Sequence, residues 1–155
     1  MSKLKQTLLL CVCYFGWLHF SWASPNEVLP TIQKISGIAY GTDPAQQFDV
    51  YLPSNVTRAP VLFMVHGGGW DSGDKANPAS VLHKMQYWTA RGYIFISTNY
   101  RLLPKADVSQ QAQDGAFAIS HAQTHASEWG ADANRFILMG HSAGAHLVSL
   151  LTVRP

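Results

Sequence analysis

The chain has 155 residues and a formal net charge of +2, with 47% hydrophobic and 13% charged residues. This composition fits a globular domain with a buried core and excludes an intrinsically disordered chain. The two cysteines, Cys11 and Cys13, both lie near the N-terminus. A disulfide framework or a thiolate metal site is therefore excluded for the rest of the chain.

The N-terminus has the pattern of an export signal. Lys3 and Lys5 precede an apolar run over residues 8–22, and the small residues Ser21 and Ala23 close it. This pattern predicts a secretory signal peptide over residues 1–23, a domain over 24–155, and a secreted or periplasmic protein. An uncleaved anchor is the alternative, but the run is shorter than a bilayer span, so no stable membrane span is expected.

Charge also restricts the partners of the mature domain. Without Lys3 and Lys5 the numbers of basic and acidic residues are equal. A nearly neutral domain lacks the electrostatic signature of nucleic-acid or anionic membrane binding. We therefore expect no nucleic-acid partner, and the sequence leaves the oligomeric state open.

Apolar runs and turn signals alternate along the rest of the chain. Strand, helix, strand, helix, strand and helix in succession predict a parallel sheet covered by helices on both faces. An antiparallel hairpin is expected to precede this alternation at a sheet edge. The predicted elements are hairpin strands 32–40 and 47–52, strand 61–65, a helix from the Asn77-Pro78 start to Gly92, strand 93–97, helix 109–129, strand 135–139 and helix 143–151.

The last predicted strand leads directly into Gly140-His141-Ser142-Ala143-Gly144. A Gly-x-Ser-x-Gly turn between a buried strand and a helix lifts the serine hydroxyl above the sheet. Gly140 and Gly144 are required because side chains there would collide with the crossing strand and helix. The N–H of Ala143 lies at the positive end of the helix, which favours developing negative charge. We predict that Ser142 is an acyl-transfer nucleophile; the alternative is a structural turn serine.

A second motif, His66-Gly67-Gly68-Gly69, follows the buried strand 61–65. Consecutive glycines let the backbone approach a ligand closely with its N–H groups turned inward. We predict Gly68 and Gly69 as oxyanion donors, Gly67 as the residue that allows the turn, and His66 as a hydrogen-bonding residue that orients the loop. A phosphate-binding loop is the alternative, but no Gly-Lys-Ser/Thr follows.

Segments 66–70, 97–102 and 140–147 together resemble the carboxylesterase and lipase branch of the α/β-hydrolase superfamily. Acetylesterase, feruloyl-esterase-like and kynurenine-formamidase-like members are the most similar, over residues 48–151. The resemblance implies an α/β fold with a predominantly parallel sheet and cleavage of small-molecule carboxylic esters through an acyl-enzyme on Ser142. It also implies an oxyanion hole from 67–69 and Ala143, and no cofactor or metal. Asn99, Tyr100 and Arg101 are then expected to support the site structurally.

The triad acid and base are not identifiable. In this superfamily they follow the serine as Asp or Glu and then His, but no carboxylate follows Ser142. His146 does follow it, and we expect it to pack or hydrogen-bond within its helix. We expect His121 and His125 at the surface or its boundary, and Asp114 as a carboxylate that braces a loop.

These gaps predict an incomplete and inactive portion of a secreted serine esterase, with strand 135–139 as an open apolar sheet edge. Two alternatives share the same motifs. One is a non-catalytic α/β-hydrolase-like binding protein or truncated relic. The other is an arylformamidase or serine peptidase built on the same fold.

Overall fold

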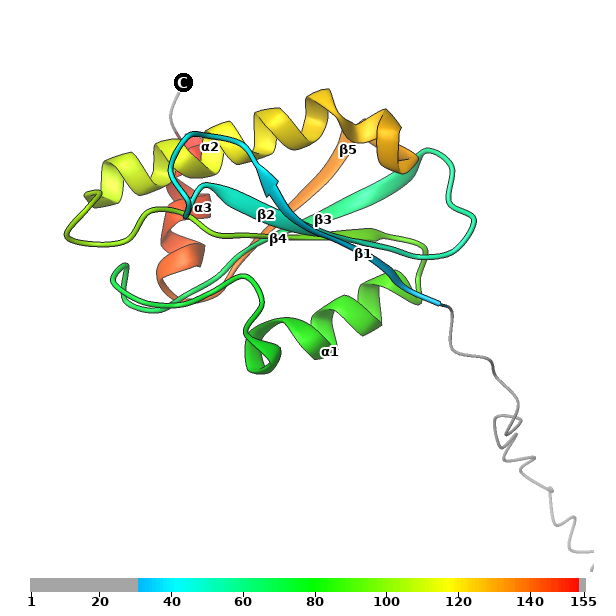
Figure 1. Cartoon of the computed structure of the whole chain (residues 1–155), viewed down its shortest axis with the longest axis horizontal. Coiled ribbons are helices and arrows are strands. Elements are labelled where there is room, and N and C mark those ends of the chain that lie inside the picture. Colours follow the sequence, from blue (N-terminus) through cyan, green and yellow to red (C-terminus); the bar gives the residue numbers. More distant parts are fainter. Residues whose placement is uncertain (1–30, 154–155) are drawn as a thin grey trace, which may run out of the picture.

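The computed structural model describes residues 31–153, so the predicted signal peptide over 1–23 lies outside the described part (Figure 1). Within residues 31–153 a five-stranded sheet has the strand order β1-β2-β4-β3-β5. The elements in chain order are β1 (Gln33–Ala39), β2 (Gln47–Leu52), β3 (Ala59–Val65), α1 (Pro78–Thr89), β4 (Ile94–Thr98), α2 (Val108–Thr124), the 3₁₀ turn η1 (Ala126–Trp129), β5 (Ala131–Gly140) and α3 (Ala143–Val153).

The sheet is mixed in direction. β3 runs parallel to both β4 and β5, as the alternation of strands and helices predicts. β1 and β2 form the predicted antiparallel hairpin, and β2 is also antiparallel to β4. The carboxyl ends of β3 and β5 therefore meet at one end of the sheet, where ligands bind in open α/β folds.

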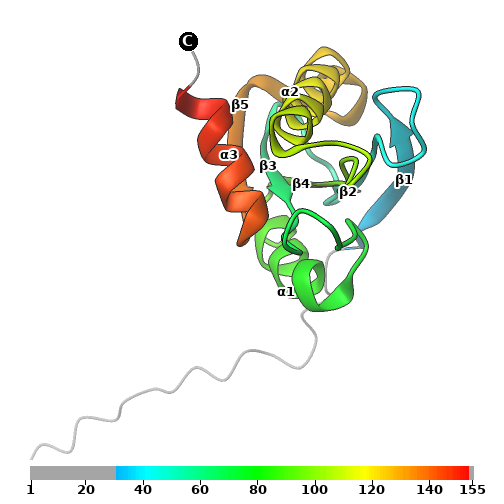
Figure 2. The ribbon, with the colours of Figure 1, turned by 90° about the vertical axis from the view of Figure 1, so that its left-hand side faces the viewer.

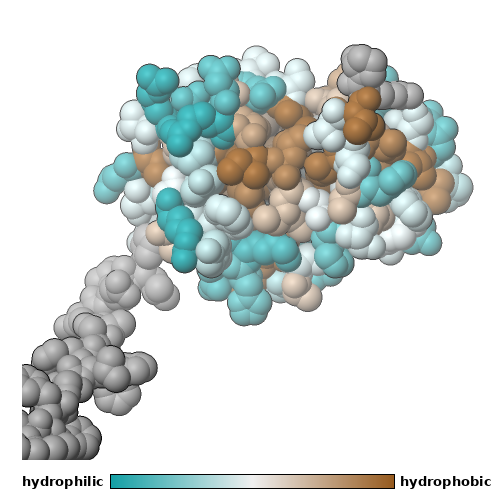
Figure 3. All heavy atoms as spheres, turned by 180° about the vertical axis from the view of Figure 1, so that it is seen from behind, coloured by the Kyte–Doolittle hydropathy of each residue, from teal (hydrophilic) through white to brown (hydrophobic). Residues whose placement is uncertain are grey.

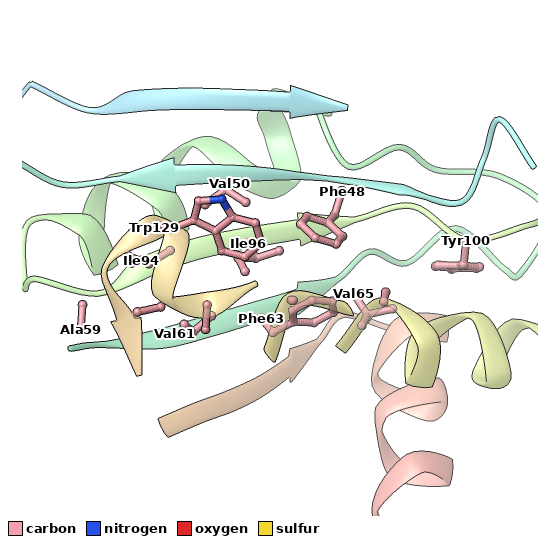
Figure 4. Packing of buried hydrophobic residues seen from close by; sticks show 14 of the residues in the cluster. Phe48, Val50, Ala59, Val61, Phe63, Val65, Ile94, Ile96, Tyr100 and Trp129 are labelled. Carbon is pink, nitrogen blue, oxygen red and sulfur yellow. The ribbon is translucent and has the colours of Figure 1, made fainter. Parts of the chain in front are cut away.

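Alternation along β3 divides the core between the two faces of the sheet, as expected for a strand with a side-chain period of two. Val61, Phe63 and Val65 join the cluster packed against α2 and α3 (Figure 4). Leu62 and Met64 face the opposite way and pack near Val81 of α1. Figure 2 shows α1 and α2 on opposite sides of the sheet, so both faces are covered.

The helix predicted over 109–129 is interrupted. α2 ends at Thr124, His125 leaves the helical conformation, and the chain continues as η1. Positions three apart face the same side in a 3₁₀ turn, so both Ala126 and Trp129 reach the core. Trp129 packs edge-on against Phe48 with ring centroids 5.9 Å apart. The tighter turn therefore gains a buried aromatic contact, and Gly130 ends it in the left-handed conformation with φ of 71°.

β5 is a sheet edge, as predicted, because among residues 31–153 no strand pairs with its outer side. Ile137 is 45% exposed there. Figure 3 shows a band of apolar atoms across the side of the molecule that carries β5 and α3. In the same range no helix combines the length and apolar character needed to cross a bilayer.

Candidate active site

Ser142 occupies the turn between β5 and α3 with its side chain exposed. Its φ of 50° lies in the left-handed region, which costs a non-glycine residue about 1–3 kcal/mol. Two hydrogen bonds hold the turn: the His141 N–H donates to the Val65 carbonyl (3.2 Å), and the Gly144 N–H donates to the His141 carbonyl (2.9 Å). The strained conformation is therefore tied directly to the end of β3.

Gly140 and Gly144 both lie where a side chain has no room, as predicted. A Cβ atom at Gly140 would collide with the backbone of Ala145, and one at Gly144 with the carbonyl oxygens of Val65 and His66. These contacts are with backbone atoms, which cannot turn aside as a flexible side chain can. Glycine at both positions therefore lets β5, β3 and α3 cross closely around Ser142.

The glycine loop that follows β3 lies against this turn. A Cβ atom at Gly67 would stand 2.6 Å from the His141 carbonyl oxygen and 3.1 Å from the Ser142 Cβ. Gly68 and Gly69 have positive φ angles of 130° and 63°, which a side chain would disfavour. Among residues 31–153 neither of their N–H groups has a hydrogen-bond partner. Two free backbone donors are thus available in the loop whose first glycine, Gly67, lies against the serine.

Ala143 is the first residue of α3 and is buried. The N–H groups of the first helical turn have no partner within the helix, and the helix dipole makes this end positive. All the residues predicted for the nucleophile and the oxyanion donors therefore come together at the carboxyl ends of β3 and β5.

His66 is buried at the start of the glycine loop. Its Nδ1 donates to the Gly67 carbonyl (2.7 Å), and its ring stacks on Tyr100 with centroids 4.5 Å apart. Burial lowers the pKa of His66, against the opposing effects of the Gly67 hydrogen bond and of Asp74. Burial also raises the pKa of Tyr100 to about 12, so its neutral hydroxyl donates to the His66 carbonyl (3.0 Å). His66 therefore orients the loop, as the sequence predicts.

Trp70 anchors the other end of the glycine loop. Its carbonyl accepts from the Leu103 N–H and from the Gln111 side chain, both at 2.9 Å. Its indole contacts the ring of His146 edge-on, with centroids 5.6 Å apart. His146 is exposed on α3, and its ring packs against the loop. The sequence predicted instead that it would pack or hydrogen-bond within its own helix.

Asp114 braces the segment that follows β4, as predicted. Its fully buried carboxylate accepts from the Arg101 backbone N–H (3.0 Å), from Arg101 Nε (2.8 Å) and Nη2 (2.6 Å), and from Gln46 Nε2 (2.8 Å). Segments from the hairpin, the β4 end and α2 are thereby joined. Arg101 and Tyr100 therefore support the site through hydrogen bonds to Asp114 and to the His66 carbonyl, respectively.

Asp49 and Lys75, which the sequence did not single out, also belong to this support. Asp49 is completely buried on β2 and forms ion pairs with Lys34 and Lys75, each at 2.8 Å. Lys75 lies in the segment after the glycine loop. The signal in the sequence was a lone aspartate between Phe48 and Val50, where a buried strand requires an apolar residue or a paired charge.

No general base accompanies the serine in this part of the chain. Among residues 31–153 the Ser142 hydroxyl makes no hydrogen bond to an imidazole or a carboxylate. A polar cavity of about 310 Å³ adjoins the glycine loop and His141. Its lining residues are His66, Gly67, Gly68, Ser72, Gly73, Asp74, Asn77, Ser80 and His141.

The chain is similar to known families and curated proteins. A family model described as BD-FAE matches residues 48–154. The probable isoprenylcysteine alpha-carbonyl methylesterase ICMEL1 of Arabidopsis thaliana is 38% identical over 117 residues, covering 75% of this chain and 24% of that protein. Esterase LipC of Mycobacterium tuberculosis is 34% identical over 144 residues, covering 86% of this chain and 35% of LipC. The chain thus spans about a quarter to a third of the length of these relatives.

The chain is also similar to solved esterase structures. An inhibited esterase B from Lactobacillus rhamnosis superposes with a TM-score of 0.69 at 30% identity, over 77% of this chain and 39% of that one. The thermophilic esterase Est2 of Thermogutta terrifontis superposes with a TM-score of 0.62 at 25% identity, over 81% of this chain and 44% of that one. The family match over 48–154 includes both the glycine loop and the Ser142 turn.

Proposed function

Because this chain belongs to the BD-FAE family and has the α/β-hydrolase fold of its esterase neighbours, we propose that the whole protein is a carboxylic ester hydrolase with Ser142 as nucleophile. The observation that carries the proposal is the contact between two motifs. The strained, exposed Ser142 lies against Gly67, in a loop whose Gly68 and Gly69 N–H groups have no hydrogen-bond partner among residues 31–153. The names of the relatives LipC and esterase B support esterase chemistry.

In the proposed reaction Ser142 Oγ bonds to the ester carbonyl carbon, and the carbonyl π electrons move to oxygen. The N–H groups of Gly68, Gly69 and Ala143 donate to this oxyanion, and losing one such donor typically costs about 2.7–4 kcal/mol of transition-state stabilisation. The serine proton passes to a base and then to the departing alcohol oxygen, which leaves an acyl-enzyme. Water repeats the sequence and releases the acid.

The proton step needs a base and an orienting acid. We propose that both are supplied from outside residues 31–153. The support is that the relatives are three to four times longer than the matched region and that this fold carries its acid and histidine after the nucleophile. The proposed substrates are small-molecule carboxylic esters.

Export is a separate proposal. Lys3, Lys5, the apolar run over 8–22 and the Ser21-Trp22-Ala23 end support a cleaved signal over residues 1–23. Ester hydrolysis would then take place outside the cytoplasm.

Labelling with a fluorophosphonate probe tests the nucleophile, because this probe forms a covalent bond only with an activated serine. The whole protein should be labelled, and Ser142→Ala should not. Ser149→Ala is the matched control, since Ser149 is an exposed serine on the same helix with its hydroxyl bonded to the Ala145 carbonyl (2.9 Å). Labelling of Ser142→Ala would overturn the assignment, and an unlabelled wild type would favour a non-catalytic binding protein.

A further inference from the structure

Asp49 is a charged group in the interior of β2. Its side chain is fully buried, with Oδ1 2.8 Å from Lys75 Nζ and 2.9 Å from the Gly37 N–H, and Oδ2 2.8 Å from Lys34 Nζ. Burial alone would raise the pKa of Asp49, but the contacts with Lys34 and Lys75 outweigh it and lower the pKa. The carboxylate is therefore ionised, and a buried charge of this kind holds its cations in place.

Lys75 is fixed at both its side chain and its backbone. Its side chain reaches Asp49, and its N–H donates to Asn99 Oδ1 at 2.5 Å. The Asn99 amide in turn donates to Asp74 Oδ2 at 2.9 Å. Asp49 lies on β2, and Asn99 follows directly after the neighbouring strand β4, so residues 74 and 75 are held against these two strands.

The clamped residues lie directly behind the glycine loop. A Cβ atom at Gly73 would collide with the Gly67 carbonyl oxygen and with the His66 ring. Gly67 itself touches the Ser142 turn. A continuous path of packed atoms therefore runs from Asp49 through Lys75 and Gly73 to the loop that holds the free N–H donors.

Lys34 contacts the same carboxylate without joining this path. It lies on β1, its side chain is 40% exposed, and its other contact is with the Tyr51 ring at 5.3 Å. The two lysines thus share one anion, but only Lys75 connects it to the glycine loop.

We infer that the buried Asp49–Lys75 pair is a positioning element that holds the glycine loop against the Ser142 turn. This inference rests on the proposed function for its catalytic meaning, because the positioned groups are the proposed oxyanion donors. Lys75 and Asp49 touch no reacting atom and act only through the loop.

Hydrogen–deuterium exchange resolved to single amides tests the inference in the full chain. The Asp71 and Ser72 N–H groups report on the loop because both donate to the Gly68 carbonyl, at 3.2 and 3.0 Å. Lys75→Met should speed exchange of these two amides by at least about tenfold. Lys34→Met is the matched control, because it removes a partner of the same carboxylate. In this variant the exchange rates of the two amides should stay within about twofold of the wild-type rates.

Turnover gives a second readout in the whole protein. Lys75→Met should lower kcat with little change in KM, because displaced oxyanion donors weaken only the transition state. Lys75→Arg, which keeps the cation, should recover part of the loss. Where Lys75→Met does not fold, Lys75→Gln takes its place, since its amide keeps a donor for Asp49.

Two results would overturn the inference. One is unchanged Asp71 and Ser72 exchange in folded Lys75→Met, or in Lys75→Gln where it takes the place of Lys75→Met. The other is equal acceleration in the Lys34 and Lys75 variants, which would mean that the pair stabilises the fold as a whole. If fluorophosphonate fails to label the wild type, the proposed function fails, while the exchange comparison still decides the positioning role.

Discussion

Gly67 lies directly against Ser142, although 74 residues separate them in the chain: a Cβ atom at position 67 would stand 3.1 Å from the Ser142 Cβ. The contact follows from the sheet, in which β3 and β5 are parallel neighbours with Val65 paired to Gly140. The glycine loop begins immediately after Val65, and the Gly-x-Ser-x-Gly turn begins at Gly140. The register of two strands therefore brings the proposed donors to the proposed nucleophile.

Gly67→Ala should reduce ester hydrolysis by the whole protein by about 10²-fold, comparable to the loss of one oxyanion donor. The added methyl group would meet the His141 carbonyl at 2.6 Å, so the loop must move away from the serine. Steady-state kinetics measure the effect. Gly115→Ala is the control, because its added methyl would meet only the flexible end of Leu151 at 3.3 Å, and activity should be retained.

Asp114→Ala should lower the free energy of unfolding by about 3 kcal/mol, because it leaves Arg101 and Gln46 without their buried acceptor. Urea denaturation of the full chain measures this change. Asp132→Asn provides the comparison, since its partner Arg58 is 83% exposed and a surface ion pair contributes about 0–1 kcal/mol. Equal losses in the two variants would contradict the bracing role of Asp114.

Stability should fall as the solution is acidified from about pH 7 to about pH 5.5. Burial lowers the pKa of His66, so below the ordinary histidine pKa of about 6.5 the unfolded chain binds more protons than the folded one. The stability contributed by neutral His66 is present above this pKa and is lost as the pH falls toward the lower folded pKa. Unfolding free energies measured across this range give the slope.

His66→Asn should make that slope shallower, because the amide keeps a donor for the Gly67 carbonyl but does not titrate. His121, whose pKa burial also lowers, supplies part of the slope that remains. If the unfolding free energy of His66→Asn changed with pH as steeply as that of the wild type, the assignment of this pH dependence to His66 would be wrong.

Cleavage of the signal should leave Ser24 as the first residue of the exported protein. Small side chains at positions 21 and 23 are what the peptidase accepts, so Ala23→Arg should retain residues 1–23. Intact mass and N-terminal sequencing of the secreted or periplasmic fraction measure the cleavage site. An uncleaved wild-type chain in the membrane fraction would favour the anchor instead.

Local patterns predicted most of the elements near the site. Asn77 caps α1 by accepting from the Ala79 N–H at 3.0 Å, as Asn77-Pro78 suggested. The inward face of that helix was less well predicted. The spacing of three between Leu82, Met85 and Trp88 predicts that they share one side of the helix, but Leu82 is 42% exposed, whereas Val81 is buried. In a short helix with few apolar residues, several faces are nearly equally apolar. Packing against the sheet therefore decides which face turns toward the core.

The sequence by itself determined the two tight backbone segments, since glycines at 67, 68, 140 and 144 allow the close approaches found there and Gly69 allows a positive φ of 63°. It also determined the alternation of strands and helices, which depends on side-chain periodicity within each segment. Tertiary structure alone decided that β4 lies between β2 and β3 and that Asp49 meets Lys75. Such pairings join residues far apart in the chain, and their energy depends on which strands become neighbours and on how completely each charge is removed from water.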